Sequence, residues 1–364
     1  MRDGIISYSE EFRILSFNPA AEQVFNLKKE EAIGLIVSPQ LISNPKFKIL
    51  SQVFFSSLAP SVSRKSEPGV YPQIIDISFG EPRLELRVST DRLVGQKGEV
   101  IGFVKIVRDR TRELEVLKSK SEFVTVAAHQ LRTPLTAVNW VFEALKNSQS
   151  INKPDLEMVT IGSAAGLKLL NTIDDLLDVA KIEEGRFGYN FENIDIVAFL
   201  ENAVGGFIGF AKNYGISISF NRPPSLTAGG QPIMILADSK KLNIVISNIL
   251  DNAIKYNVKN GQVIVDLQVL SDKPYVQISI KDTGIGVSSE DLSRLFSKFH
   301  RGENALKLQT EGSGLGLYIV KNIIFRHGGQ IWAESILNRG TTFYFILPTD
   351  PKLIPQKEIT YLED

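Results

Sequence analysis

The longest regular pattern of apolar positions lies in the middle of the chain. Apolar residues recur at steps of three and four from Leu114 to Leu145, which predicts a helix with a coiled-coil or bundle seam. The stretch 147–154 interrupts the pattern, and a second helix with the same spacing ends at Glu184-Gly185, as a glycine C-terminus should. Two antiparallel helices with one apolar stripe each bury it poorly alone, so residues 111–185 of two chains are predicted to form a four-helix bundle.

Residues 1–110 show the short alternating runs of a mixed α/β domain. Asn18 followed by Pro19 predicts the start of a short helix, because asparagine caps helices and proline fits their first position. Five of the sixteen prolines fall in 39–72, which predicts a loop-rich stretch. Strands are expected at 5–8, 12–17, 74–79, 83–89 and 100–107.

Residues 186–349 return to an α/β pattern, and 350–364 read as a tail. Alternation predicts three strands, at 263–269, 276–280 and 343–347. Helices are expected near 195–212, 239–257 and 315–327. The expected fold class is therefore multidomain α/β, with a helical hairpin between two α/β domains.

Composition narrows the function. The 41 basic and 41 acidic residues balance, so charge gives no reason to expect nucleic-acid or membrane-surface binding. The absence of cysteine excludes disulfides, thiolate nucleophiles and cysteine-ligated metals, and three histidines make a multi-histidine site possible only if the fold gathers nearly all of them. No run of 18 apolar residues and no signal peptide is present. We expect a soluble, cytoplasmic chain, either whole or part of a longer parent.

His129 falls just outside the predicted seam, with Thr133 one turn further on the same face. On the helix alone, a surface histidine near Pro134 is the simpler interpretation. His300 lies in an aromatic-rich segment. His327 comes at a helix end, where its ring can interact with the last carbonyls.

Polar groups suited to a nucleotide follow about a hundred residues later. Asn248 and Asn252 are one helical turn apart and share a face. Amide oxygens are hard, neutral ligands suited to Mg²⁺, and Lys255 can meet phosphate oxygens. An ordinary amphipathic helix is the alternative. Asp282 ends a predicted strand, where its carboxylate can accept a hydrogen bond from the amine of a base.

Glycines surround these groups. Gly284 and Gly286 would permit close approach of a ligand. The run 312–317, Gly-Ser-Gly-Leu-Gly-Leu, opens a predicted helix whose free N–H groups suit phosphate. It fits neither the dinucleotide fingerprint nor the P-loop. Asp-Thr-Gly at 282–284 also occurs in aspartic proteases, but a single copy would need a dimer to build the dyad. Each segment alone is weak, whereas their order and spacing are specific.

The ordered set resembles the motifs of a two-component sensor histidine kinase over nearly the whole chain. His129–Leu135 resembles the H-box of the dimerisation and histidine-phosphotransfer domain. Four later segments resemble, in order, the motifs of the GHKL-type ATP-binding domain. They are 248–256 (N-box), 282–286 (G1 box), 296–301 (F-box) and 312–317 (G2 box). The helix opened by Asn18-Pro19 and the closing strand at 104–111 resemble a PAS sensor domain.

The resemblance implies a role for each matching residue. His129 would be the phosphoacceptor, Asn252 the Mg²⁺ ligand with Asn248 beside it, and Asp282 the partner of the adenine amine. The remaining contacts to ATP would come from Lys255, Tyr256, Gly284, Gly286, Arg301, Gly312, Gly314, Gly316 and Leu317. Residues 299–313 would form a lid over ATP.

The domains implied are a PAS-like sensor at 1–110, the phosphotransfer hairpin at 111–185, an α/β sandwich that binds ATP at 186–349, and the tail at 350–364. The cofactors implied are ATP and Mg²⁺. The partners are a second copy of the chain through 111–185 and the receiver domain of a separate response regulator, with no nucleic acid and no membrane in this chain.

One position departs from the family pattern. The family usually has Glu or Asp directly after the histidine, and this chain has Gln130. An amide oxygen can accept the ring N–H and fix the tautomer, but it cannot take the proton. We therefore expect Gln130 to orient His129 and autophosphorylation to be slower than with an acid. Thr133 matches the residue that positions water in dephosphorylation of the regulator.

Gln130 also keeps an alternative open, a GHKL-fold scaffold or phosphatase-only regulator with little kinase activity. For the sensor domain we predict no cofactor, since residues 1–128 contain neither histidine nor cysteine; a small apolar ligand, a partner protein or a ligand-free relay remain. Trp140 and Trp332 are expected in the core. The second helix of the hairpin carries an acidic set that is expected to form a solvated face: Asp174, Asp175, Asp178, Glu183 and Glu184.

Overall fold

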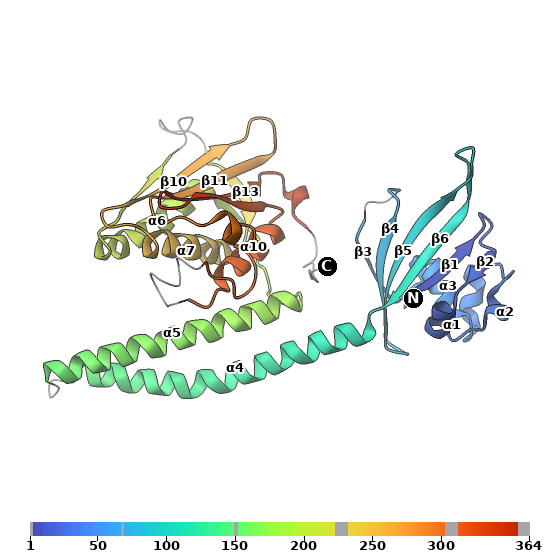
Figure 1. Ribbon diagram of the computed structural model, residues 1–364, viewed down its shortest axis with the longest axis horizontal. Coiled ribbons are helices and arrows are strands. Elements are labelled where there is room, and N and C mark those ends of the chain that lie inside the picture. The colour runs from blue at the N-terminus through green and yellow to red at the C-terminus, as the bar shows by residue number, and fades with distance from the viewer. Residues whose placement is uncertain (1–2, 67–68, 149–151, 223–231, 303–311, 356–364) are drawn as a thin grey trace. The chain divides into compact units, whose positions relative to one another are not determined.

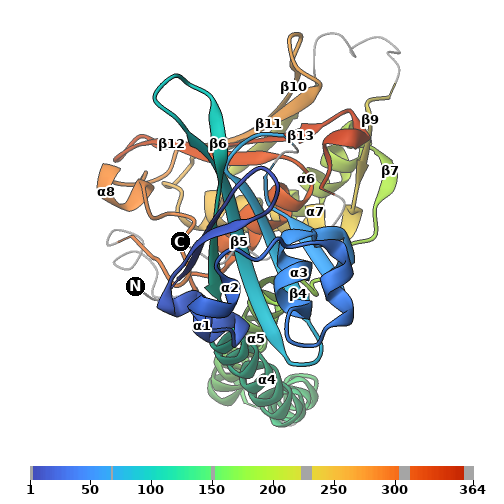
Figure 2. The same ribbon diagram turned by 90° about the vertical axis from the view of Figure 1, so that its right-hand side faces the viewer.

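The computed structural model describes residues 3–66, 69–148, 152–222, 232–302 and 312–355. The chain divides into two compact units, Met1–Lys120 and Ser121–Asp364. Figures 1 and 2 show the elements of both units in two views. Each unit is described by itself.

The first unit is an antiparallel sheet of six strands in the order β2-β1-β6-β5-β4-β3. Three short helices pack on one face of the sheet and share its core (Figure 1). The strands are β1 (Gly4–Tyr8), β2 (Ile14–Phe17), β3 (Ser61–Arg64), β4 (Gln73–Phe79), β5 (Leu84–Val94) and β6 (Val100–Asp109). The helices are α1 (Pro19–Phe25), α2 (Lys29–Ala32) and α3 (Lys48–Phe54), with 3₁₀ turns at Pro39–Ser43 and Ser56–Leu58.

Local sequence explains α1. The Asn18 side chain accepts a hydrogen bond from the N–H of Ala21 at 2.8 Å, and Pro19 opens the helix as predicted. The prediction of loops for 39–72 is wrong in part, because α3 lies there. Its Leu50 and Val53 are fully buried in the core of this unit. The helix is only seven residues long, too short for its periodicity to stand out from the prolines around it.

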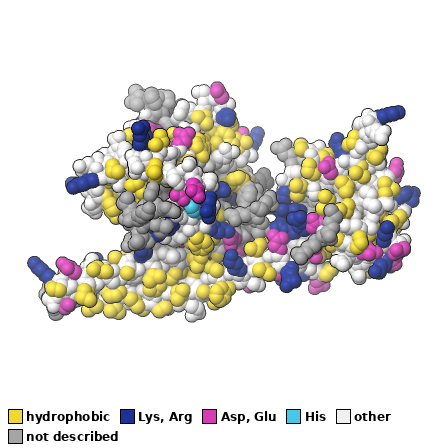
Figure 3. Space-filling view, viewed as in Figure 1, with side chains coloured by type: hydrophobic (Ala, Val, Ile, Leu, Met, Phe, Trp, Pro, Cys, Tyr) yellow, Lys and Arg dark blue, Asp and Glu magenta, His cyan; other side chains and the backbone are white. Residues whose placement is uncertain are grey.

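The central hairpin consists of α4 (Thr111–Lys146) and α5 (Lys153–Glu183). The predicted seam divides into two sets. Ser121 and Ala128 are buried against α5, whereas Leu131, Val138 and Leu145 are 55%, 46% and 39% exposed. Hydrophobic side chains gather along the hairpin surface in Figure 3. A single chain therefore leaves part of its seam exposed, as expected for one half of a four-helix bundle.

The rest of the second unit is an α/β sandwich. Its mixed five-stranded sheet has the order β12-β13-β11-β10-β8. The strands are β8 (Ser217–Asn221), β10 (Gln262–Val269), β11 (Tyr275–Asp282), β12 (Gln330–Ile336) and β13 (Gly340–Pro348), and β7 (Glu192–Asp195) pairs with β9 (Met234–Ala237). The helices are α6 (Ile196–Asn213), α7 (Ser239–Lys255), α8 (Ser289–Leu292) and α10 (Gly316–Arg326), followed by a 3₁₀ turn at Pro351–Leu353.

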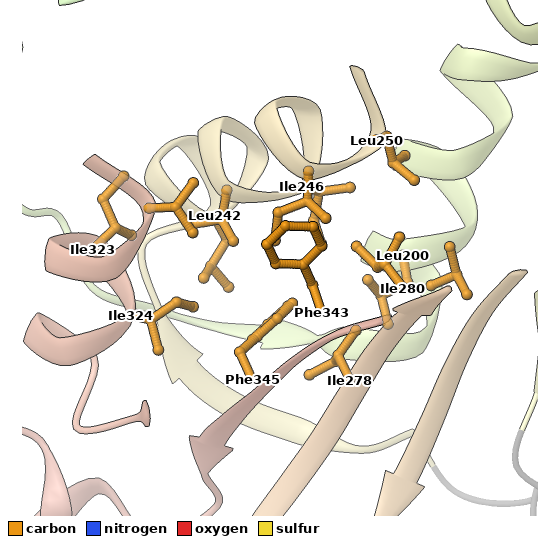
Figure 4. Close-up of a cluster of buried hydrophobic side chains, with 14 of the residues drawn as sticks. Leu200, Leu242, Ile246, Leu250, Ile278, Ile280, Ile323, Ile324, Phe343 and Phe345 are labelled. Atoms are coloured by element: carbon orange, nitrogen blue, oxygen red, sulfur yellow. The ribbon is translucent and has the colours of Figure 1, made fainter. Parts of the chain in front are cut away.

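A single apolar core joins these helices to the sheet. Leu242 and Ile246 of α7 point toward Phe343 and Phe345 of β13 (Figure 4), and all four are buried. The three helices and three strands predicted for 186–349 are present, with ends within a few residues of those expected. This core fixes the ends of α7 and β11, where the predicted nucleotide-binding motifs lie.

Two burial predictions for this unit are wrong. Trp140 is 73% exposed in the single chain, because it lies on the side of α4 that faces away from α5. Trp332 is partly buried and stacks on Tyr344, with ring centroids 5.4 Å apart.

The acidic face of α5 is not simply solvated, as had been expected. Asp175 accepts a hydrogen bond from Ser313, and Glu183 accepts one from Lys298.

Candidate functional site

His129 lies on the exposed surface of α4, as predicted. Thr133 is also exposed, and its Oγ1 lies 3.4 Å from the backbone oxygen of His129, so the two share a face. Pro134 lies inside the helix and has no N–H for the Gln130 carbonyl one turn earlier. The ring of His129 and the amide of Gln130 are both accessible to an incoming reactant.

Polar contacts tie α4 to α5 both before and after His129 along the helix. Arg132 forms an ion pair with Asp174, and Ser121 Oγ donates to the Ala180 carbonyl at 3.2 Å. The histidine is therefore carried on a packed helical scaffold rather than on a loop, which restricts where its ring can point.

On α7, three predicted ligand-binding residues occupy one helical face. Asn248 Nδ2 donates to the Ile244 carbonyl at 3.0 Å, and Lys255 Nζ lies 2.6 Å from Asp251 Oδ2. Among the described residues, none hydrogen-bonds to the Asn252 side chain. All three predicted residues are half-buried. An amide oxygen without a protein partner suits a divalent cation such as Mg²⁺.

Asp282 ends β11 and is 7% exposed. Its Oδ1 accepts hydrogen bonds from the N–H groups of Gly284 at 2.7 Å and Thr341 at 3.1 Å. Burial raises the pKa of this carboxyl to about 6, although both hydrogen bonds oppose the rise. The two donors hold one oxygen in place, so the other can accept a hydrogen bond from an amine.

The G1 glycines are required by close backbone contacts. A Cβ on Gly284 would lie 2.3 Å from the Tyr256 carbonyl oxygen, and one on Gly286 would lie 2.2 Å from the Ile336 carbonyl oxygen. The N–H of Ile285 donates to the same Tyr256 carbonyl at 3.0 Å. This brings the end of α7, the loop after β11 and the end of β12 together in one place.

The G2 box adjoins the same place. A Cβ on Gly316 would lie 2.2 Å from Asn248 Oδ1, which puts the start of α10 against α7. Arg301 Nη1 approaches the Gly312 carbonyl at 3.4 Å, and Gly314 has a φ of +70° close to the Phe299 backbone. Leu317 is partly buried against the core. The lid predicted at 299–313 lies partly outside the described residues, since 303–311 are not described.

The other two histidines are less exposed than His129. His327 is 1% exposed, its Nε2 accepts the N–H of Asp238 at 3.0 Å, and its Nδ1 lies 2.7 Å from the Ile323 carbonyl oxygen. Burial lowers its pKa to about 4, so the ring is neutral near pH 7. His300 Nε2 lies 3.4 Å from Asp291 Oδ1. Neither ring stands on the open surface as His129 does.

Two regions of the chain match protein-family models. Residues 119–185 match the His Kinase A (phospho-acceptor) domain, and 237–351 match the Histidine kinase-, DNA gyrase B-, and HSP90-like ATPase family. The sensor histidine kinase WalK of Bacillus subtilis is 28% identical over 96% of this chain, and the sensor protein kinase WalK of Staphylococcus aureus is 29% identical over 96%. This chain belongs to the two-component sensor histidine kinases.

The chain spans about half the length of these histidine kinase relatives, 54% of each. The crystal structure of full-length ShkA in complex with AMPPNP is similar to 62% of this chain and 45% of that one, at 27% identity and a TM-score of 0.51. In the described part of this histidine kinase, no helix is long and apolar enough to cross a membrane.

Pattern reasoning missed several residues of the site in this histidine kinase. The backbone N–H of Thr341 donates a hydrogen bond to Asp282 Oδ1, and no sequence pattern indicates this contact. Asn257 was also missed: its Oδ1 accepts from Thr283 Oγ1 at 3.0 Å and links α7 to the G1 loop. The contact of Asp175 with Ser313 joins residues 138 positions apart, so only the folded chain shows it.

Proposed function

We propose that this chain autophosphorylates His129 from Mg²⁺-ATP and passes the phosphoryl group to an aspartate of a response regulator. The observation that carries the proposal is the pairing of an exposed histidine on α4 with a nucleotide-type site at the ends of α7 and β11. A ring nitrogen of His129 would bond to the γ-phosphorus as the bond to the β–γ bridging oxygen breaks. The products are phosphohistidine and ADP.

In this proposal each site residue has a separate task. Asp282 accepts from the adenine amine, while Gly284 and Gly286 shape the wall beside the base. Asn252, with Asn248 beside it, would hold Mg²⁺, which neutralises phosphate charge when bound. The remaining groups orient the nucleotide and its phosphates: Lys255, Tyr256, Arg301, Gly312, Gly314, Gly316 and Leu317. Phosphoryl transfer asks mainly for such positioning and charge neutralisation.

We further propose that the chain acts as a homodimer through 111–185 and that the first unit is a PAS-type sensor. The exposed part of the α4 seam supports the dimer, because a monomer would leave those side chains in water. The antiparallel sheet with helices on one face supports the PAS assignment.

Labelled ATP tests the proposal. The wild-type chain should acquire acid-labile, base-stable label, and His129→Ala should lose it while still binding ATP. His300→Ala is a matched control that should retain the label. Label retained in His129→Ala would refute the assignment.

Gln130 and Thr133 favour a second candidate function, a regulator that acts chiefly as a phosphatase. Both side chains are exposed beside His129, and an amide in place of an acid weakens proton transfer from the ring more than it weakens the positioning of water by Thr133. Chains that bind ATP without labelling, yet dephosphorylate a receiver domain in a Thr133-dependent way, would support this candidate.

A further inference from the structure

Helix α5 holds the nucleotide-binding part of its own chain at two polar points. Ser313 Oγ of the G2 box donates to Asp175 Oδ2 at 2.7 Å, and Lys298 Nζ of the F-box donates to Glu183 Oε1 at 2.5 Å. Asp175 and Glu183 are eight residues apart, roughly 12 Å along the helix. We call these two hydrogen bonds the α5 contacts.

Apolar packing surrounds the α5 contacts. Val179 is buried in the core of the α/β sandwich, and Leu176 and Ile182 pack against it. Lys298 Nζ also lies 4.9 Å from the centroid of the Tyr318 ring on α10. Helix α5 therefore lies against the element that the G2 box opens, and the two hydrogen bonds fix where it lies.

The Ser313 contact occupies groups that a phosphate would use. Ser313 Oγ accepts the N–H of Leu315 at 3.2 Å and directs its proton to Asp175. A hydroxyl has one proton to donate. With the α5 contacts formed, neither the hydroxyl proton nor the Leu315 N–H is presented to a ligand at the start of α10.

The charge of Asp175 also opposes the binding of phosphate. The Asp175 carboxyl is partly buried. Burial raises its pKa, the hydrogen bond from Ser313 opposes the rise, and Asp178 and Asp174 add to it. A partly buried charge is screened less than an exposed one. When ionised, the Asp175 carboxylate places a negative charge against the G2 box, which flanks the phosphates in the proposed function. That charge would repel the negative phosphates of ATP.

We propose that the Asp175–Ser313 contact competes with the β- and γ-phosphates of ATP for the G2 box, so that helix α5 restrains its own nucleotide site. This inference rests on the proposed ATP site. By linkage, ATP binding weakens the contact by the same factor as the contact weakens ATP binding. A change in the hairpin that moves α5 would thereby change ATP affinity without touching the nucleotide.

The test compares two ligands in the full chain by calorimetry. Asp175→Ala, which removes the acceptor as well as the charge, should bind Mg²⁺-ATP roughly fivefold or more tightly than wild type, while adenosine, which lacks phosphates, should bind within twofold. Glu157→Gln removes one negative charge from an exposed part of α5 and should change neither affinity. Asp175→Ser, whose shorter side chain no longer reaches Ser313, serves as a second variant if the alanine variant misfolds, with the same expectation.

Three results would overturn the inference. One is unchanged or weaker ATP binding in both Asp175 variants while wild type binds ATP. Another is an equal gain for adenosine, which would mean that the substitution reshapes the base site. A gain of the same size in Glu157→Gln would show only a general charge effect. If wild type bound neither ligand, the proposed function itself would fail.

Discussion

The backbone N–H of Gly284 donates a hydrogen bond to Oδ1 of Asp282 at 2.7 Å. The carboxyl is thus held by the loop that follows it and is buried at the end of β11. Because burial outweighs this hydrogen bond, the pKa rises to about 6. Near pH 5, where an ordinary aspartate is already ionised, Asp282 is therefore still mostly protonated. A nucleotide that binds the ionised form must displace that proton.

The first prediction concerns pH and adenine binding. The ionised carboxylate accepts from the adenine amine, so adenosine affinity should increase as pH rises through about 6 and level off above pH 7. Below that pKa, each pH unit should cost about tenfold in affinity. Asp282→Asn should bind weakly at every pH. Calorimetry between pH 5 and 8 measures both, and a flat profile for wild type would contradict the assignment.

Much of this site follows from local pattern, and part of it does not. The helix that carries Asn248 and Asn252, and the strand that ends at Asp282, were predictable because periodicity and polar breaks mark them. The Thr341 hydrogen bond to Asp282 and the Ser313 hydrogen bond to Asp175 join residues 59 and 138 positions apart. Such contacts depend on tertiary packing, to which a periodic pattern is blind.

The seam of α4 gives the second lesson. Its spacing predicted a buried stripe, yet Val138 and Leu145 are substantially exposed in one chain. The spacing shows which apolar residues share a face of the helix. It does not show whether the helix that packs on that face belongs to the same chain. Trp140, which was expected in the core, is also exposed in the single chain.

The second prediction tests the proposed dimer. Val138→Glu combined with Leu145→Glu places charges at two exposed positions of the seam, at a distance from His129. Burying them in a bundle is costly, so the dimer should dissociate at least about a hundredfold more readily, as measured by sedimentation equilibrium. Ile101→Glu changes a residue of similar exposure, 56%, in the first unit and should leave the dimer intact. Equal association of all three proteins would contradict the proposal.

The third prediction concerns His327, which bridges the end of α10 and the start of α7. His327→Phe keeps an aromatic ring but leaves the Asp238 N–H without its partner, while the Ile323 carbonyl keeps the backbone N–H of residue 327. The loss should be about 1–3 kcal/mol in the free energy of unfolding, read from urea denaturation. Lys321→Gln on the exposed side of α10 should stay within about 0.5 kcal/mol of wild type.

The same residue predicts a pH dependence. The folded-state pKa of His327, about 4, lies below the unfolded value of about 6.5. The unfolded chain therefore binds the proton first as pH falls, and the His327 contribution to stability is complete above about 6.5 and is lost toward pH 4. His327→Phe should flatten the stability profile in that window, and an unchanged slope would contradict the neutral buried ring.

The fourth prediction concerns Lys105, a buried lysine on β6. It is 6% exposed, donates to Thr90 Oγ1 at 2.9 Å, and has its pKa lowered to about 8 by burial. The unfolded chain keeps the proton up to about pH 10.4, so stability should increase between about pH 8 and 10.4 as the folded chain loses it. Lys105→Met should raise the melting temperature at pH 7, with a gain that shrinks above pH 8.

The matched control for Lys105 is Lys97→Met, which removes an exposed lysine from the turn between β5 and β6. It should change neither the melting temperature nor its pH profile. If Lys105→Met instead lowered the melting temperature at pH 7, the ammonium group would be stabilising the domain, and the burial argument would be wrong.

The last prediction concerns Gln130, the residue beside the proposed phosphoacceptor. An amide can accept the ring N–H of His129 but cannot take its proton, whereas a carboxylate can do both. Gln130→Glu should therefore raise the rate of autophosphorylation at saturating ATP by roughly tenfold to a hundredfold, with KM for ATP unchanged because the side chain is on α4. Gln96→Glu, the same change in the exposed turn between β5 and β6, is the control. A slower Gln130→Glu enzyme would mean that the amide is the better neighbour for this histidine, and that proton removal does not limit the rate.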